Sequence, residues 1–354
     1  MSPPDWPAWH ARLAPLLHPV GRLYALAMRG RAQAYALEMK TTWRPPRPCI
    51  SVGNIAWGGS GKTPLCQYLL EQALAAGQRP ALLTRGYRAA PPHFPYLVCP
   101  DSLPSAAGDE PLLLAQACPG ALVCVDPHRG RAGKWLWRSC QPDLFVLDDG
   151  FQHRAVKRDL DLVLLRPADL GSQWNRVLPA GTWREGICAL HRADAFCIQA
   201  PPEQWPELRA RFVDRLGSLN KPLFSFALRT RGVIHCATGH RLPSPPGPYL
   251  LVSGIAGPGR VRRTAEQAFG PPVAHLPFPD HHTFSAANWE TIRETAQAHG
   301  ATTVLCTPKD AVKLRLHADA TLFSFDLDLR FGPHWLAGQS FAQWVHHRLK
   351  PCWQ

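Results

Sequence analysis

The sequence predicts an α/β protein with a phosphate-loop NTPase-like, mainly parallel sheet flanked by helices, and a second, smaller α/β lobe. Short β-rich runs alternate with helical segments from residue 48 onward, which is the pattern of βαβ units. A glycine-rich segment joins the first of these runs to a helical segment. With 354 residues, 45% of them hydrophobic, the chain can fill a large core.

The predicted elements follow in order along the chain. Strands are expected over residues 48–54, 80–85, 121–125, 143–148, 160–165, 194–198, 249–255 and 302–306. Helices are expected over residues 62–76, 110–118, 130–140 and 203–217, with a final amphipathic helix near 334–349.

Three regions are predicted from this order. Residues 1–46 form an N-terminal amphipathic helical region, residues 47–225 form the phosphate-loop core, and residues 226–354 form a smaller C-terminal α/β lobe. The Pro-rich and Gly-rich loop from Leu242 to Pro248 lies near the connection between the last two.

The N-terminal region has apolar residues at helical spacing, among them Leu16, Val20 and Leu23, with arginines interspersed. Pro15 and Pro19 are expected to interrupt or kink this helix. No run of 18 or more uncharged apolar residues occurs, so a membrane-spanning helix is not expected. The pattern fits a helix in a membrane interface and a helix packed on the protein's own core equally well.

The net charge of +13 calls for an acidic partner, which could be nucleic acid, anionic lipid or a phosphorylated small molecule. No interleaving of aromatic and basic residues supports nucleic acid. The eleven cysteines form no Cys-x-x-Cys pair and no secretory signal opens the chain, so we expect reduced thiols and a cytoplasmic location.

The glycine-rich segment is predicted to bind a nucleotide. Its backbone N–H groups can turn onto phosphate oxygens, while Lys62 supplies a cation and Thr63 a hydroxyl for Mg²⁺. Ala56 stands where the strict pattern has its first glycine. The strand before it and the helix after it favour this interpretation over a turn with an incidental lysine. The predicted binding segment is Ala56, Trp57, Gly58, Gly59, Ser60, Gly61, Lys62 and Thr63.

Two acids, Asp148 and Asp149, end the apolar run Leu144–Leu147. In a phosphate-loop protein this is the place for the acidic partner of Mg²⁺, so one carboxylate can hold the ion while the other orients a neighbour. The residue pattern alone does not choose which acid holds the metal, and Asp149 is included with Lys62 among the catalytic candidates. A surface turn after a strand is the alternative.

Further candidates lie in two other motifs. Asp109 follows Gly108 at the start of a helical segment, where capping is its default role. His281 and His282 follow Asp280 in the C-terminal lobe, and one of them could act as a base. Taken alone, a polar loop is the commoner explanation for this pair.

Several polar residues near strand ends are predicted to contact substrate or phosphate, since arginine binds phosphate through two hydrogen bonds. These are Arg85, Arg129, Gln152, His153 and Arg184. The segment Thr307-Pro308-Lys309-Asp310 departs from the guanine-specificity pattern because its lysine is displaced by one position. We therefore favour ATP over GTP.

With these motifs in order, the chain resembles the tetraacyldisaccharide 4'-kinase family, the lipid A 4'-kinases of Gram-negative bacteria. The matching motifs span most of the chain: Val52–Ile55 before the phosphate loop, Thr84–Tyr87, Gly108–Pro111, Asp148–His153, Leu178–Gly181, Phe278–His282 and Thr307–Leu314.

The resemblance implies transfer of the γ-phosphoryl group of ATP, with Mg²⁺, to the 4'-hydroxyl of an anionic tetraacyldisaccharide 1-phosphate. It also implies that residues 47–225 are a kinase core and that the chain works at the cytoplasmic face of the inner membrane as a peripheral protein. Asp109 and His281 map onto the family's dyad that activates the acceptor hydroxyl, and Asp148 maps onto its Mg²⁺ partner.

The main alternative function is a phosphate-loop ATPase or GTPase that acts as a switch or delivery factor without a lipid acceptor. Neither nucleic acid nor an obligate protein partner is expected.

Overall fold

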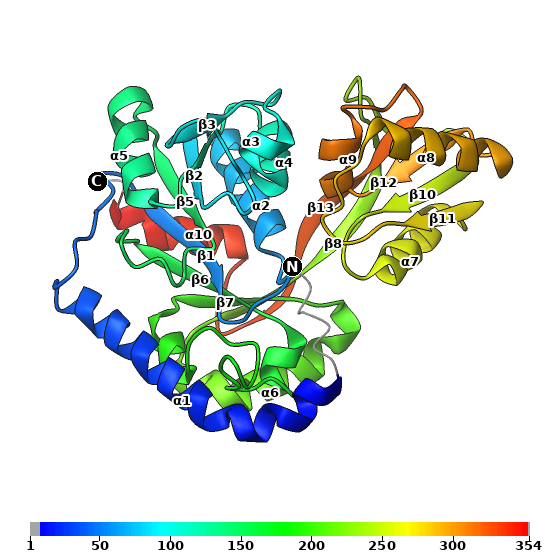
Figure 1. The fold of residues 1–354 in the computed structure, drawn as a ribbon. Coiled ribbons are helices and arrows are strands. Elements are labelled where there is room, and N and C mark those ends of the chain that lie inside the picture. Colours follow the sequence, from blue (N-terminus) through cyan, green and yellow to red (C-terminus); the bar gives the residue numbers. More distant parts are fainter. Residues whose placement is uncertain (1–7, 353–354) are drawn as a thin grey trace.

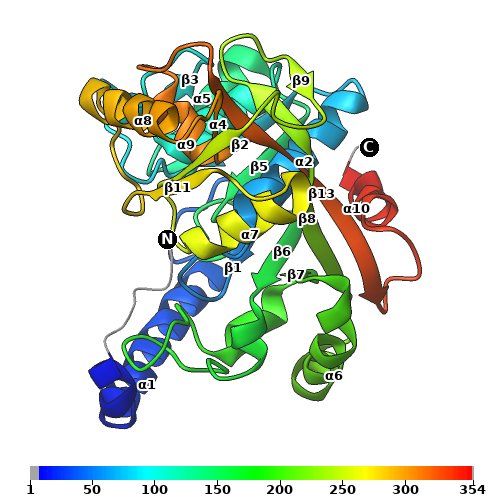
Figure 2. The ribbon, with the colours of Figure 1, turned by 90° about the vertical axis from the view of Figure 1, so that its right-hand side faces the viewer.

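The computed structural model describes residues 8–352, and residues 1–7 of the predicted N-terminal region lie outside them. The described strands form one continuous sheet of 13 strands. Its order is β11-β10-β12-β13-β8-β7-β6-β1-β5-β2-β4-β3, with β9 paired to β8. Helices cover its faces (Figures 1 and 2). The predicted α/β class with a mainly parallel sheet is confirmed.

The bounds of the elements follow the chain. The strands are β1 Cys49–Asn54, β2 Pro80–Thr84, β3 Tyr96–Val98, β4 Leu122–Val125, β5 Leu144–Asp148, β6 Leu160–Leu165, β7 Ala195–Gln199, β8 Leu223–His235, β9 Arg241–Leu242, β10 Tyr249–Ser253, β11 Ala274–Pro277, β12 Thr303–Cys306 and β13 Leu322–Trp335. The α-helices are α1 Ala8–Ala36, α2 Lys62–Ala75, α3 Pro104–Ala107, α4 Asp109–Ala117, α5 Arg129–Cys140, α6 Trp205–Leu216, α7 Pro258–Phe269, α8 Ala286–Ala298, α9 Pro308–Leu314 and α10 Phe341–Leu349.

The first half of the sheet brings the predicted site residues to one edge. Strand β1 lies between β5 and β6, and β2 lies between β5 and β4, all in parallel. Helices cover both sides of the sheet, so the residues of these strands are buried on both faces and are mostly apolar. Their carboxyl ends therefore meet, and the phosphate loop after β1 lies beside Asp148 at the end of β5.

Strands β8 and β13 join the two halves of the molecule. They run antiparallel over most of their length, and Figure 1 shows them passing from the region of α2 and α10 into the region of α7, α8 and α9. The sequence prediction placed neither β8 nor β13. Residues 322–331 nevertheless alternate apolar and polar side chains, which is the period of a strand.

The C-terminal helix begins later than predicted and belongs to a different part of the core. Strand β13 continues to Trp335, so the prediction of a helix near 334–349 placed its first residue too early. Helix α10 covers Phe341–Leu349. Its Phe341 packs against Tyr68 of α2 and Phe224 of β8, in the same core cluster as β1. The division at residues 225 and 226 stays a prediction, although β8 crosses it and α10 returns to the phosphate-loop side.

Helix α1 is continuous from Ala8 to Ala36, with Pro15 and Pro19 inside it. The prolines therefore do not interrupt the helix, although Figure 1 shows that it changes direction along its course. The helix lies along one side of the molecule, below α6 in the view of Figure 1. Its inward face is made of small residues, because Ala14 and Gly21 are buried and a Cβ atom on Gly21 would come within 2.9 Å of the Val177 carbonyl oxygen. Among the described residues, no helix is long and apolar enough to cross a membrane.

Candidate active site

The phosphate loop runs from the end of β1 to the first turn of α2. Gly58 and Gly61 have positive φ angles of 107° and 88°, a backbone conformation that glycine adopts at little cost. Gly61 also precedes the helix directly, so the first N–H groups of α2 have no side-chain cap and face the loop. This arrangement provides the free N–H groups that a phosphate-binding loop uses.

The atypical residues of the loop have partners in a neighbouring segment. Ala56 is fully buried and forms a β-bridge with Trp183, and the N–H of Trp57 donates to the Thr182 carbonyl at 2.8 Å. Arg166 donates to the Trp57 carbonyl at 2.6 Å. The departure from glycine at position 56 therefore places a small apolar side chain in the core.

Lys62 is held between the loop and the acids that follow β5. Its Nζ donates to Asn54 Oδ1 at 3.1 Å and lies 3.5 Å from Asp149 Oδ1. Its side chain is only 18% exposed. The lysine thus lies beside the loop, where the terminal phosphates of a nucleotide would need a cation.

Asp148 is buried at the carboxyl end of β5, where it accepts a hydrogen bond from Thr84 Oγ1 at 2.8 Å. Burial raises the pKa of its carboxyl group to about 6, and the negative charges of Glu110 and Asp149 add to this shift. The charge of Lys62 offsets this shift only in part, and Asp148 forms no ion pair among the described residues. It is therefore suited to a metal ion.

Asp149 has a different environment from its neighbour. Both of its carboxylate oxygens accept hydrogen bonds from Arg184 at 2.8 Å, in a two-pronged ion pair. Burial alone would raise the pKa of Asp149, but the charges of Lys62 and Arg184 outweigh it and hold that pKa well below its usual range. Asp149 is therefore a carboxylate that orients Lys62 and Arg184.

Glu110, which the sequence prediction did not assign, connects the phosphate loop to the second half of the chain. Thr63 Oγ1 donates to Glu110 Oε2 at 2.7 Å, and Lys309 of α9 forms an ion pair with Glu110 Oε1. Burial opposes ionisation, but Lys309 and the Thr63 hydroxyl lower the pKa of Glu110 to about 2. The motif Gly108–Pro111 contained this acid, but only its spatial neighbours show its role.

Asp109 and His281 meet across the two halves. Asp109 begins α4, and its Oδ2 lies 3.6 Å from His281 Nδ1 and 3.4 Å from the Nζ of Lys313. Burial opposes ionisation of Asp109, but His281 and Lys313 outweigh it and lower its pKa. The other ring nitrogen of His281, Nε2, is buried with no hydrogen-bond partner among the described residues and lies 3.9 Å from Asp280 Oδ1. It is therefore free to bind a proton from an acceptor group.

The adjacent histidine is used for structure. His282 Nε2 pairs with Asn288 Oδ1 at 3.2 Å, and its ring packs against Phe278 and Phe284 with centroid separations of 4.8 and 4.9 Å. The two histidines thus have different surroundings, and only His281 faces Asp109.

The remaining predicted contacts lie beside the acids. Arg129 begins α5, is 6% exposed, and its guanidinium lies 3.3 Å from His153 Nδ1. Burial and the charge of Arg129 lower the pKa of His153 to about 3. Gln152 donates to the Asn54 carbonyl at 3.0 Å, whereas Arg85 is exposed after β2 with no hydrogen bond among the described contacts.

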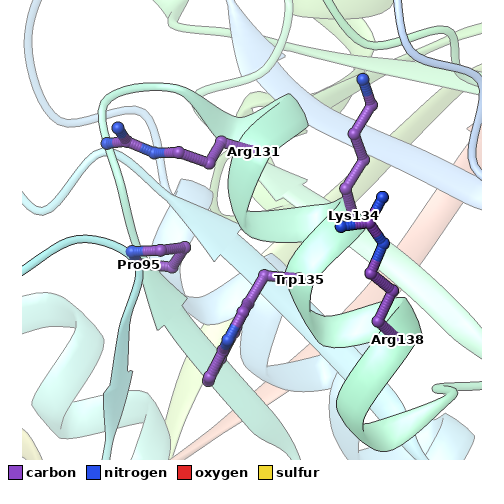
Figure 3. Close-up of a pocket in the computed structure, with 5 residues that line it drawn as sticks. All are labelled: Pro95, Arg131, Lys134, Trp135 and Arg138. Atoms are coloured by element: carbon purple, nitrogen blue, oxygen red, sulfur yellow. The ribbon is translucent and has the colours of Figure 1, made fainter.

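Two cavities lie outside the loop and the Asp109–His281 pair. One of about 450 Å³ is lined by Pro95 and by side chains of α5, among them Trp135, as Figure 3 shows. It contains no predicted site residue, and its Arg131 already makes two hydrogen bonds to Asp126. The other, of about 190 Å³, includes His153. The candidate site is therefore identified from the contacts among its side chains, and neither cavity encloses the phosphate loop or the Asp109–His281 pair.

Comparison with known proteins agrees with this geometry. Residues 13–349 match the model of the family described as tetraacyldisaccharide-1-P 4'-kinase. The chain belongs to this family. The 4'-kinase of Nitratidesulfovibrio vulgaris is 49% identical over 338 residues, covering 95% of this chain and 94% of that protein. The 4'-kinase of Oleidesulfovibrio alaskensis is 45% identical over 342 residues, covering 94% of each.

A solved structure of a 4'-kinase has the same fold. The crystal structure described as the "apo" form of LpxK from Aquifex aeolicus in complex with ATP matches with a TM-score of 0.77 and 27% identity. The match covers 97% of this chain and 100% of that one. The family resemblance predicted from the sequence is confirmed.

Proposed function

We propose that this 4'-kinase transfers the γ-phosphoryl group of ATP to the 4'-hydroxyl of a tetraacyldisaccharide 1-phosphate in lipid A biosynthesis. The observation that carries the proposal is the full-length family match, residues 13–349, around an intact phosphate loop and an Asp109–His281 pair. The relatives' names state this activity for those proteins.

The donor half of the reaction uses the phosphate loop. Its N–H groups and Lys62 bind the β- and γ-phosphates of ATP, while Asp149 and Arg184 keep Lys62 in place. Arg129 and Arg85 lie on the same edge of the sheet and add positive charge toward the transferring group. Phosphoryl transfer depends mostly on such positioning and charge neutralisation.

Thr63 and Asp148 fit a Mg²⁺ ion, because a hydroxyl and a buried carboxylate that forms no ion pair among the described residues offer hard oxygen ligands. When bound, Mg²⁺ would neutralise charge on the phosphates. Among the described residues, no three His, Cys, Asp or Glu side chains converge as a metal cage. This is consistent with Mg²⁺ in nucleotide sites, which takes few protein ligands and keeps phosphate oxygens and water.

The acceptor half uses the pair that spans the two halves. His281 takes the proton of the 4'-hydroxyl on Nε2 while Asp109 orients the ring through Nδ1. The hydroxyl oxygen then forms a bond to the γ-phosphorus, the bond from that phosphorus to the bridging oxygen breaks, and ADP leaves with the electron pair. The proton stays on His281 until solvent removes it.

Membrane association is the part of the proposal that rests on α1. The helix packs its small residues inward and leaves large apolar side chains exposed, including Leu16 at 74%, Leu23 at 68% and Leu26 at 64%. The acyl chains of the acceptor stay in the bilayer, so an exposed apolar helix with Arg22 and Arg29 is suited to the anionic cytoplasmic face of the inner membrane.

The test is the identity of the product. The purified chain with ATP, Mg²⁺ and a tetraacyldisaccharide 1-phosphate should give a lipid heavier by one phosphate, with the new phosphomonoester at the 4' position by phosphorus NMR. An acceptor lacking the 4'-hydroxyl should give none, and Lys62→Met should lower the rate at least about 100-fold. A phosphate elsewhere on the sugar would contradict the proposal.

A further inference from the structure

We propose that Lys313 is a positioning residue of this reaction, whose ammonium group holds the Asp109 carboxylate toward His281. The inference rests on the proposed function, since it concerns the pair that activates the acceptor hydroxyl. Lys313 is then a third member of this group. It lies on α9, outside the motifs Gly108–Pro111 and Phe278–His282 that contain Asp109 and His281.

The surroundings of Lys313 show that its charge is used within the protein. Its side chain is 9% exposed, and its Nζ lies 3.4 Å from Asp109 Oδ2 and 3.8 Å from Asp310 Oδ1. The ammonium also lies 5.6 Å from the centre of the Phe284 ring. A lysine buried to this extent needs nearby anions to offset the loss of water, and here one of the two anions is Asp109.

Helix α9 is fixed in a way that aims Lys313. Asp310 is fully buried and accepts hydrogen bonds from the Gly254 N–H at 2.9 Å and from Thr307 Oγ1 at 2.7 Å. Thr307 in turn caps the helix. These contacts tie α9 to the end of β10, so Lys313 extends from a rigid element.

One oxygen of Asp109 receives both partners. Oδ2 is the atom closest to Lys313 and the atom closest to His281, and both partners come from the second half of the chain. Lys309, one turn earlier on α9, makes the corresponding ion pair with Glu110. Two lysines of one helix thus face two successive acids at the start of α4, which fixes how the two halves meet at the dyad.

The charge of Lys313 acts on the dyad in two ways. It keeps Asp109 ionised, and it restricts the rotation of that carboxylate. The other groups facing the dyad are Asp280 on the histidine's own loop, the Tyr87 ring, Lys309, Asp310 and Glu110. Removing the Lys313 ammonium leaves the negative charge of Asp310 near Asp109 with less positive charge to offset it.

The experiment compares Lys313→Met and Lys313→Arg in the full-length chain, measuring kcat and KM against pH with the glycolipid acceptor. For Lys313→Met we expect kcat to fall about 10- to 100-fold with KM for ATP almost unchanged, since the loss is one of orientation. The acid limb of the kcat profile should move to higher pH, because Lys313 helps to lower the pKa of Asp109 and its loss lets that carboxylate take a proton at higher pH. Lys313→Arg should keep the wild-type limb and lose less activity.

Controls separate this role from a merely structural one. In the background of Asp109→Asn, Lys313→Met should cause little further loss, because the group that it positions is already impaired. Arg293→Met removes an exposed ion pair in the same half and should leave the profile unchanged. A Lys313→Met protein with a lowered melting temperature but a wild-type kcat profile would overturn the proposal. Absence of lipid phosphorylation by the wild type would instead overturn the proposed function.

Discussion

His281 and His282 are neighbours in the sequence with different tasks in the structure. His281 faces Asp109, whereas His282 packs between Phe278 and Phe284 and pairs with Asn288. His281→Ala should therefore lower kcat by about 10²- to 10⁴-fold, the usual contribution of a general base. KM for ATP should stay close to wild type, because the phosphate loop is untouched. Steady-state kinetics at saturating lipid measure both values.

The matched control for this prediction is His282→Ala. It should lower the melting temperature more than the turnover, and equal losses of kcat in the two variants would contradict the assignment. Asp109→Ala combined with His281→Ala should be no worse than the more damaging single change, because the two residues act as a unit.

His153 should make stability depend on pH. Its folded-state pKa of about 3 lies below the ordinary value of 6.5, so the unfolded chain binds a proton that the folded chain rejects. Stability from this source is present above pH 6.5 and is lost as the pH falls toward 3. Replacing His153 by Asn should remove that part of the acid sensitivity, about 1 to 2 kcal/mol after allowing for partial exposure of the ring.

Urea unfolding of the wild type and of His153→Asn at pH 7 and pH 4.5 measures this difference. The free energy of unfolding of the variant should fall less between the two values. The same fall in both proteins would contradict the burial of a neutral imidazole beside Arg129.

At the scale of elements, α1 has an unusual distribution of side chains. Its small residues contact the protein and its large apolar residues contact solvent, so its exposed face is available to bind a bilayer surface. Changing Leu16 and Leu23 to Ser should reduce co-sedimentation with anionic vesicles at least about 10-fold, since each buried leucine contributes about 1.5 to 3 kcal/mol. Melting temperature should hardly change.

The control for α1 removes exposed apolar side chains from other elements. Leu316 and Leu336 are each 52% exposed, and changing both to Ser should leave vesicle binding intact. Equal binding by the α1 variant and the wild type would contradict a role for this helix at the membrane.

The sequence predicted some elements much better than others, for physical reasons. The parallel strands β1, β2, β4, β5, β6 and β7 were placed within a residue or two, because buried strands read as short apolar runs between turns. Strand β13 was missed although Phe323–Phe331 alternates. Of the two effects expected from the prolines of α1, an interruption did not occur, since tertiary packing can keep a helix continuous through them.

The residues of the candidate site were also predicted with unequal success. Local motifs were sufficient to select Lys62 and the pair Asp148 and Asp149, whose residue types stand at characteristic places after strands or before helices. The role of Asp109 came from the family resemblance, because its position alone indicates a helix cap. Glu110, Lys309 and Lys313 were not found, because each matters only through a partner distant in sequence. The choice of His281 over His282 rested on family resemblance alone, and the structure supplies the contacts that distinguish the two.

At the scale of the whole molecule, one sheet holds both halves and α10 returns to the first of them. Phe341 is 1% exposed and stacks on Phe331 of β13 with a centroid separation of 4.0 Å. Phe341→Ala should lower the free energy of unfolding by about 3 to 5 kcal/mol, the usual cost of a large core truncation. Denaturant unfolding measures it, and Val213→Ala at a half-exposed site should cost less than about 0.5 kcal/mol. Equal effects of the two changes would contradict the placement of α10 in the core.

The central claim concerns the whole molecule as well: donor and acceptor groups from the two halves meet in one reaction. The most direct test is the ratio of ATP consumed to lipid phosphorylated by the wild-type chain with Mg²⁺, with and without the tetraacyldisaccharide 1-phosphate. The account predicts one ATP for each phosphorylated lipid, and very little ATP consumption without lipid. Release of free phosphate at the same rate in the absence of lipid would contradict it and would favour a phosphate-loop ATPase that acts as a switch.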